Sequence, residues 1–235
     1  MSAAPPSYQP VATLDERTRS DFIVRVYQHL AAAVLAFVGI EALFLSTGIA
    51  KGIYNLIAGS PVSWLLILGG FMVVNWLAAT AAHDLTNTNK QYAGLFGLAA
   101  AEAVIFAPFL YLIFTVQDAG STVWSAAFVT IVGFAALSGV AYTTRRDLSF
   151  LRPMLMWGGV AALVLILTAV LFGLNLGVWF SVAMIALAGA SILYQTQVIM
   201  QRYPAEAYVG AAVQLFASVM LLFWYVLRLF SEMRR

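Results

Sequence analysis

The sequence contains no cysteine and only two histidines, His29 and His83. The lack of thiols excludes a disulfide framework, thiolate metal sites and cysteine nucleophiles. With so few imidazoles we expect no metal site and no cofactor. Charged residues make up 9% of the chain, whereas they make up about 25% of a typical soluble domain. The formal net charge is only +2 and the basic residues form no patch, so we expect no binding of nucleic acid.

Hydrophobic residues are abundant instead. They make up 63% of the 235 residues, and the mean hydropathy is +0.91. A soluble globule of this size could not bury so much apolar surface, so the composition indicates an all-α integral membrane protein. About 20 apolar residues form a helix that crosses the roughly 30 Å of hydrocarbon in a bilayer. Seven runs of about this length predict a seven-helix transmembrane bundle, with helices at residues 22–47, 62–82, 92–115, 122–144, 153–172, 176–200 and 207–230.

The rest of the chain is short. Residues 1–21 are polar and Pro-rich and lack the pattern of a signal peptide, so we expect an uncleaved cytoplasmic tail. Residues 22–230 then form a single transmembrane domain, and residues 231–235 form a short basic C-terminus. No defensible nucleophile–base pair, Gly-rich phosphate loop or metal-ligand cluster appears, so we do not expect an enzyme.

Lysine and arginine predict the orientation, because they are enriched in cytoplasmic loops. Seven of them fall on the side of the N-terminus and three on the other side, with Arg228 at a helix edge, so we expect a cytoplasmic N-terminus. The closing "RLFSEMRR" opposes this orientation unless the last segment enters the membrane and returns. The short tail and compact loops suggest a bacterial inner membrane. The seven residues are Arg17, Arg19, Lys90, Arg145, Arg146, Arg152 and Arg202; the three are Lys51, Arg234 and Arg235.

One carboxyl group falls near the middle of a predicted span. Glu102, in "LAAAEAVIFAP", lies ten residues into the third segment, which is about 15 Å deep at 1.5 Å per residue. An acid at that depth is either functional or a structural acid held by a neighbouring helix, and the sequence leaves both interpretations open. Pro108 frees a backbone carbonyl on the preceding turn and is expected to kink the helix near Glu102.

Other polar residues in the segments have simpler explanations. Arg25 and His29 share a helix face; Arg25 is expected to extend to the interface, and His29 either titrates or makes a packing contact. Glu41 is expected to be a charge in water at the outer rim, and Asn75 is expected to bond between helices.

A polar block interrupts the apolar run "SILYQTQVIM" at residues 191–200. Gln195 is expected at a depth similar to that of Gln214 in the last segment, and Ser218 lies one turn from Gln214 on the same face. Amides that face each other across a helical hairpin can satisfy one another. Composition alone therefore indicates hydrogen bonding between helices here.

Four stretches also resemble one known family. They are "FIVRVYQHLAAAVLAFVGIEALFL", "GLFGLAAAEAVIFAPFLYL", "FAALSGVAYTTRRDLSFLRPMLMWGGVAAL" and "ILYQTQVIM". Together they resemble the Bax inhibitor-1 (transmembrane Bax inhibitor motif) family over residues 22–230. The resemblance implies a membrane protein of six or seven helices, in which one central helix is wrapped by the others. It also implies a link to passive, pH-sensitive calcium leak, to suppression of cell death in eukaryotes, or to a membrane-anchored protease in bacteria.

The resemblance also places individual residues. Glu102 matches a glutamate of the family's third helix, and Arg145, Arg146 and Asp147 match its loop motif. In the family's leak model, two aspartates on the last two helices share a proton and gate the pore. Gln195 and Ser218 stand at those two positions here, so we expect this chain to lack a di-aspartyl pH gate.

Two functions follow as alternatives. The first is a passive cation leak, with Ca²⁺ as a partner and with Glu102, His29, Gln195, Gln214 and Ser218 as candidates for the ion pathway. The second is a non-conducting scaffold or modulator in the lipid bilayer that binds a membrane complex such as a protease or a respiratory assembly. The aromatic-rich "LLFWYVLRLF" of the last segment would suit a lateral contact in that case, although its rings could equally be interface anchors.

Overall fold

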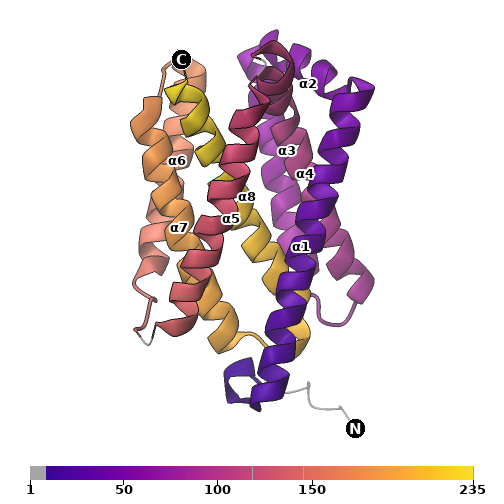
Figure 1. The fold of residues 1–235 in the computed structure, drawn as a ribbon, viewed down its shortest axis with the longest axis vertical. Helices are drawn as coiled ribbons and strands as arrows, with labels where there is room; N and C mark the ends of the chain where they lie inside the picture. The colour runs from indigo at the N-terminus through magenta and orange to yellow at the C-terminus, as the bar shows by residue number, and fades with distance from the viewer. Residues whose placement is uncertain (1–8, 118, 145, 235) are drawn as a thin grey trace.

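The computed structural model describes residues 9–117, 119–144 and 146–234, and in these ranges the chain is a bundle of helices (Figure 1). Seven of the described helices are long and apolar enough to cross a membrane, which confirms the predicted all-α seven-helix transmembrane bundle. They are α1 (Glu16–Thr47), α3 (Pro61–Ala82), α4 (Thr88–Tyr111), α5 (Gly120–Thr143), α6 (Leu151–Phe172), α7 (Gly177–Arg202) and α8 (Tyr208–Met233).

Helix α8 lies in the middle of the bundle (Figure 1). In its most apolar stretch 72% of the residues are buried, whereas the corresponding stretch of α6 is 6% buried. The outer helices therefore keep apolar side chains for lipid, while α8 is packed on all sides by protein. This arrangement agrees with the central helix that the family resemblance implies.

The central position of α8 corrects one expectation. Its aromatic run was considered as a lateral contact surface for another protein, but Phe223 and Tyr225 are buried and Trp224 stacks on Trp64 of α3. Helix α8 also continues unbroken to Met233, so the last segment does not enter the membrane and return. A partner protein would have to bind the outer helices instead.

A short helix that was not predicted, α2 (Ile49–Ala58), lies between α1 and α3. Gly48 ends α1 and begins α2 with a φ of 82°, a conformation that glycine adopts without strain. Helix α2 packs against α4 through the rings of Tyr54 and Tyr111, whose centroids lie 5.3 Å apart. Ten residues are too few to cross a bilayer, so hydropathy gave no signal for this element.

The ends of the bundle also differ from the prediction. Helix α1 begins at Glu16, where the side chain of Asp15 accepts a hydrogen bond from the Thr18 N–H, as an N-cap does. Before it, the 3₁₀ turn Val11–Thr13 is attached to the α7–α8 link, because the Val11 N–H donates to the Tyr203 carbonyl at 2.7 Å. The Val11 side chain is fully buried. Part of the expected polar tail is therefore packed onto the domain.

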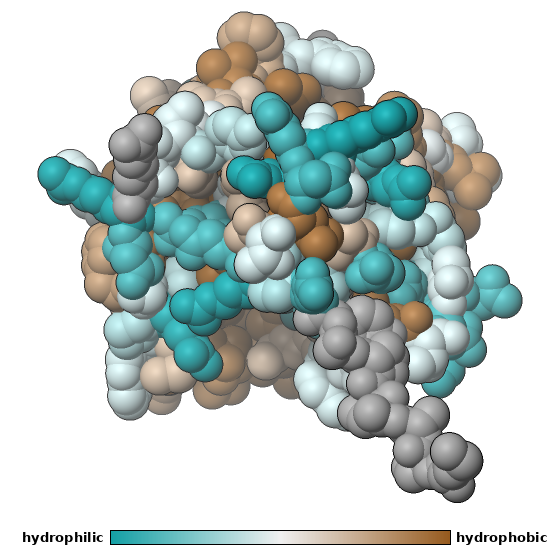
Figure 2. Space-filling model, turned by 90° about the horizontal axis from the view of Figure 1, so that it is seen from below, coloured by the Kyte–Doolittle hydropathy of each residue, from teal (hydrophilic) through white to brown (hydrophobic). Residues whose placement is uncertain are grey.

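The links and chain ends form two opposite faces. The N-terminal face, at the bottom of Figure 1, carries the link 83–87, residues 146–150 of the link between α5 and α6, and the link 203–207. Hydrophilic side chains gather across it when it is viewed from below (Figure 2). The C-terminal face carries α2, the four-residue link 173–176 and the end of α8 (Figure 1).

The backbones of three helices approach closely near the N-terminal face. A Cβ atom on Gly94 of α4 would lie 2.7 Å from the Ala78 carbonyl oxygen of α3, and one on Gly210 of α8 would lie 2.9 Å from that of Ala82. Small residues allow such close packing in membranes. The contacts leave little space between α3, α4 and α8 at this end of the bundle.

Candidate functional site

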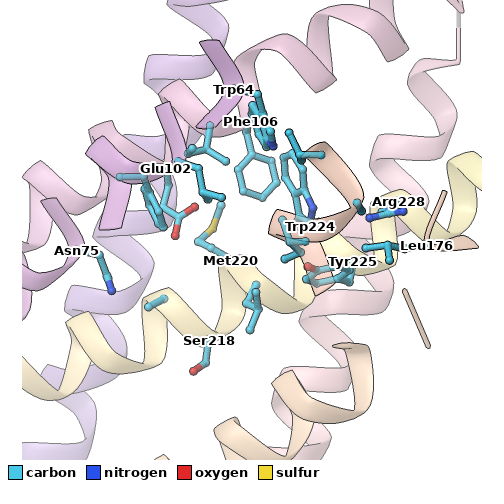
Figure 3. A pocket seen from close by; sticks show the side chains of 18 of the residues that line it. Trp64, Asn75, Glu102, Phe106, Leu176, Ser218, Met220, Trp224, Tyr225 and Arg228 are labelled. Atoms are coloured by element: carbon cyan, nitrogen blue, oxygen red, sulfur yellow. The ribbon is translucent and has the colours of Figure 1, made fainter. Parts of the chain in front are cut away.

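A cavity of about 650 Å³ lies between α3, α4, α6 and α8 (Figure 3). It extends along α8 from Ser218 to Arg228, which is about 15 Å at 1.5 Å per residue. The link 173–176 lines it at the C-terminal face. Most lining side chains are apolar or aromatic, and the polar or charged ones include Asn75, Glu102, Asn175, Ser218 and Arg228.

Glu102 supplies a carboxyl group to this cavity. The residue is 6% exposed, and its carboxyl points into the space near Met220 (Figure 3). Among the described residues, none donates a hydrogen bond to this carboxyl or forms a salt bridge with it. Pro108 lies farther along α4 and cannot donate to the carbonyl four residues before it, and the helix ends in the π turn Leu112–Val116. Glu102 therefore lies in the cavity wall, on a helix that is irregular toward its C-terminal end.

Gln195 and Ser218 are in direct contact at the inner end of the cavity. The Ser218 hydroxyl donates to Gln195 Oε1 at 2.9 Å, and Gln195 Nε2 donates to Ser191 Oγ at 3.0 Å. Ser191 Oγ lies 3.0 Å from Ser218 Oγ, and the Ser218 proton is already used, so Ser191 donates. The three side chains thus form a closed ring of hydrogen bonds, which we call the Gln–Ser ring. None of its groups carries a charge at neutral pH.

Gln214 does not face Gln195, so the expected pairing of the two amides is wrong. Its Nε2 lies 3.4 Å from Nε2 of His83, which also lies 3.1 Å from the Tyr203 hydroxyl. The Nδ1 atom of His83 donates to the Ala79 carbonyl at 2.6 Å, because a carbonyl oxygen can only accept. Burial raises the pKa of Tyr203 to about 12, which keeps its hydroxyl a donor. Gln214 therefore belongs to a cluster at the N-terminal face.

His29 is also held outside the cavity. Its Nδ1 donates to the Arg25 carbonyl at 2.7 Å, and its Nε2 lies 2.9 Å from the Tyr92 hydroxyl. The centroids of the His29 and Tyr208 rings lie 4.9 Å apart, and the Arg25 guanidinium lies over the Tyr208 ring. Of the five candidates for the pathway, the structure places Glu102 and Ser218 in the cavity wall, with Gln195 bonded to Ser218.

The structure does not bear out the expectations for Glu41 and Asn75. Glu41 was expected in water at the rim, but it is 4% exposed, and both of its carboxyl oxygens are buried without a hydrogen-bond partner among the described residues. The expectation rested on the depth of Glu41 along the helix and assumed that its side chain faces outward. The side chain faces the protein instead. Asn75 lines the cavity without a side-chain hydrogen bond to any described residue.

The loop motif is attached to α7 through a residue that sequence analysis missed. Gln197 Nε2 donates to the Arg146 carbonyl at 2.7 Å, and its Oε1 accepts from the Leu148 N–H at 2.8 Å. The Asp147 carboxylate accepts hydrogen bonds from the N–H and the hydroxyl of Ser149, and these bonds lower its pKa. Arg145 lies outside the described residues. The second glutamine of "LYQTQ" was the available signal for this contact.

An ion pair lies at the other end of the cavity. Arg228 Nε donates to Glu232 Oε1 at 2.9 Å, and the Ser181 hydroxyl donates to Glu232 Oε2 at 3.2 Å. The charge of Arg228 is thus offset by its neighbour one turn further along α8. Sequence analysis treated Arg228 only as a charge at a helix edge.

Comparison with known proteins agrees with this architecture. A family model described as "Inhibitor of apoptosis-promoting Bax1" matches residues 19–235. The chain belongs to the Bax inhibitor-1 family. It is also similar to an uncharacterised protein of Pseudomonas aeruginosa, with 27% identity over 227 residues that cover 95% of each chain. The resemblance read from the sequence motifs is confirmed, and the protein is a multi-pass membrane protein of this family.

Proposed function

We propose that this Bax inhibitor-1 protein is a passive cation leak, with Ca²⁺ among the ions that pass, and that its gate carries no titratable group. One observation supports the proposal above the others. The cavity that reaches the link 173–176 at the C-terminal face contains the carboxyl of Glu102 and is lined by Ser218, which is bonded to Gln195. The cavity would be the outer vestibule and the Gln–Ser ring its inner end.

Glu102 would attract cations into this vestibule. An unpaired carboxylate near the middle of a membrane lowers the energy of a cation beside it. Ca²⁺ in a tight site takes about six to eight oxygen ligands. The described lining offers far fewer side-chain oxygens than that, and the Ser218 hydroxyl is already bonded to Gln195. Weak coordination of this kind suits passage better than retention, because conduction requires that the ion can leave.

The Gln–Ser ring would act as a neutral closure. Two adjacent carboxylates cannot both ionise cheaply, so a di-aspartyl pair binds a proton and responds to acid. Glutamine and serine bind no proton in this range. We therefore expect that conduction depends on Glu102 and does not depend on protonation at positions 195 and 218.

A non-conducting role is the second candidate, and it has a specific observation in its favour. Both hydroxyls of the Gln–Ser ring donate within it, and the backbones of α3, α4 and α8 are in close contact between the ring and the N-terminal face. A bundle closed in this way could bind a protease or another complex through its outer helices.

The test is Ca²⁺ uptake into liposomes at pH 6, 7 and 8. The native protein is compared with the double variant Gln195→Asp, Ser218→Asp, which restores two carboxyl groups at the contact. We expect uptake by the native protein, and a stronger response to acid in the double variant, because only the variant has carboxyl groups at positions 195 and 218 in addition to that of Glu102. A native protein that gives no more uptake than empty liposomes, beside a double variant that conducts, would favour the non-conducting role.

A further inference from the structure

Aromatic side chains line the same cavity as Glu102. Trp64 of α3 stacks on Trp224 of α8 with centroids 6.3 Å apart, and Phe106 meets Trp224 edge to face at 5.0 Å. Phe106 comes one turn after Glu102 on α4, so its ring and the carboxyl lie on the same side of that helix (Figure 3). Three helices therefore bring aromatic rings and one carboxyl group to one cavity.

This combination has a chemical preference. Aromatic rings attract cations through their negative faces, and Trp does so most strongly. A carboxylate buried without a partner is unfavourable, and a bound cation supplies the missing partner. A bare metal ion would need several more oxygen ligands than the wall offers. An organic cation needs none, because its apolar groups can pack on the rings and on Leu68, Phe71, Ile166 and Val170.

We infer that the cavity is a binding site for a hydrophobic organic cation, with its charged centre between Glu102 and the aromatic rings. A volume of about 650 Å³ lies within the roughly 300–1,000 Å³ that is usual for small-molecule sites. Arg228 at the outer end does not oppose such a ligand strongly, since Glu232 is bonded to it. The inference deepens the proposed function, because a ligand held here would block the vestibule. Binding itself does not require that the protein conducts.

The test uses two ions of nearly the same shape and opposite charge, tetraphenylphosphonium and tetraphenylborate. Binding of each is measured by equilibrium dialysis at pH 8 with the full chain in nanodiscs, and binding to empty nanodiscs is subtracted. We expect saturable binding of the phosphonium and none of the borate. Glu102→Gln, which keeps the size of the side chain, should weaken phosphonium binding by about tenfold or more, equivalent to about 1.4 kcal/mol.

Matched variants separate the site from general effects. Trp224→Leu should weaken phosphonium binding, whereas Trp157→Leu should not, because Trp157 lies on α6 with its side chain exposed. Glu206→Gln removes an exposed carboxyl outside the cavity and should also leave binding unchanged. Equal binding of both ions would mean that the cavity takes any hydrophobic molecule, including a lipid chain, and would overturn the inference. Undiminished phosphonium binding by Glu102→Gln would overturn it as well.

The two proposals can fail separately. Saturable phosphonium binding by a protein that gives no Ca²⁺ uptake would reject the leak and support the site. Ca²⁺ uptake that phosphonium does not inhibit, in a protein that does not bind it, would support the leak and reject the site.

Discussion

The close approach of α3 and α4 gives a sharp prediction at Gly94. In Gly94→Ala the new Cβ would lie 2.7 Å from the Ala78 carbonyl oxygen and 3.3 Å from the Ala81 Cβ. An ordinary van der Waals contact begins near 3.4 Å, so the helices would have to separate by about 0.7 Å or bend. Neither atom can move away alone, because the Ala78 oxygen belongs to the backbone and the Ala81 Cβ is bonded directly to it. Strain of this kind costs about 1–3 kcal/mol.

The matched control lies one turn further along the same helix. A Cβ on Gly97 would meet nothing within 4 Å, so Gly97→Ala adds a better helix former without a clash. Thermal unfolding of both variants in the same detergent is the assay. A change of 1 kcal/mol shifts the midpoint of a protein of this size by about 2–4 °C. Gly94→Ala should therefore lower the midpoint by several degrees, and Gly97→Ala should leave it unchanged or raise it. A rise in both would refute the close packing of α3 on α4.

Three further predictions concern the ends of the bundle. Val11→Asp should lower the unfolding midpoint, because the Val11 side chain is fully buried. Ala12→Asp, at an exposed position, should not lower it. Equal effects of the two substitutions would mean that the turn Val11–Thr13 is not packed on the domain. The hydrogen bonds from Ser149 lower the pKa of Asp147, so their stabilisation is complete above the ordinary aspartate range, about pH 4, and is lost as the pH falls through the lowered value. The midpoint advantage of the native protein over Asp147→Asn should shrink below pH 4, and a pH-independent difference would contradict this reasoning. The chain has no cysteine, so a single cysteine at Asn89 or at Asn55 labels one face of the bundle each. With a cytoplasmic N-terminus, an impermeant maleimide should label Asn55→Cys and not Asn89→Cys in intact cells. Labelling of Asn89→Cys alone would mean that the N-terminus is outside.

The number of spans was predictable because each one needs a long apolar run, which hydropathy detects directly. Helix α2 was not, since its ten residues are too few to cross a bilayer and it forms by packing on α4. The burial of Glu41 was missed for a different reason. Depth along a helix does not determine which side faces the protein, and α1 turns Glu41 inward.

Parts of the site could be predicted from the sequence. The contact of Gln195 with Ser218 followed from the family resemblance, and the structure shows the bond between them. The partner of Gln214 did not follow, because His83 lies 131 residues away, at the end of a helix whose position in the bundle the sequence does not give. The grouping of aromatic side chains in the cavity with Glu102 could not be predicted for the same reason, since Trp64, Phe106 and Trp224 come from three helices. Each looked like an ordinary apolar residue in its own segment.

In the proposed leak the carboxylate of Glu102 attracts the cations, so removing its charge should reduce Ca²⁺ uptake. Ca²⁺ uptake at pH 7 is compared between liposomes that hold equal amounts of the native protein, Glu102→Gln and Glu206→Gln. We expect uptake by the native protein and by Glu206→Gln, and a loss of most of it in Glu102→Gln. Uptake by Glu102→Gln at the native rate would contradict the account.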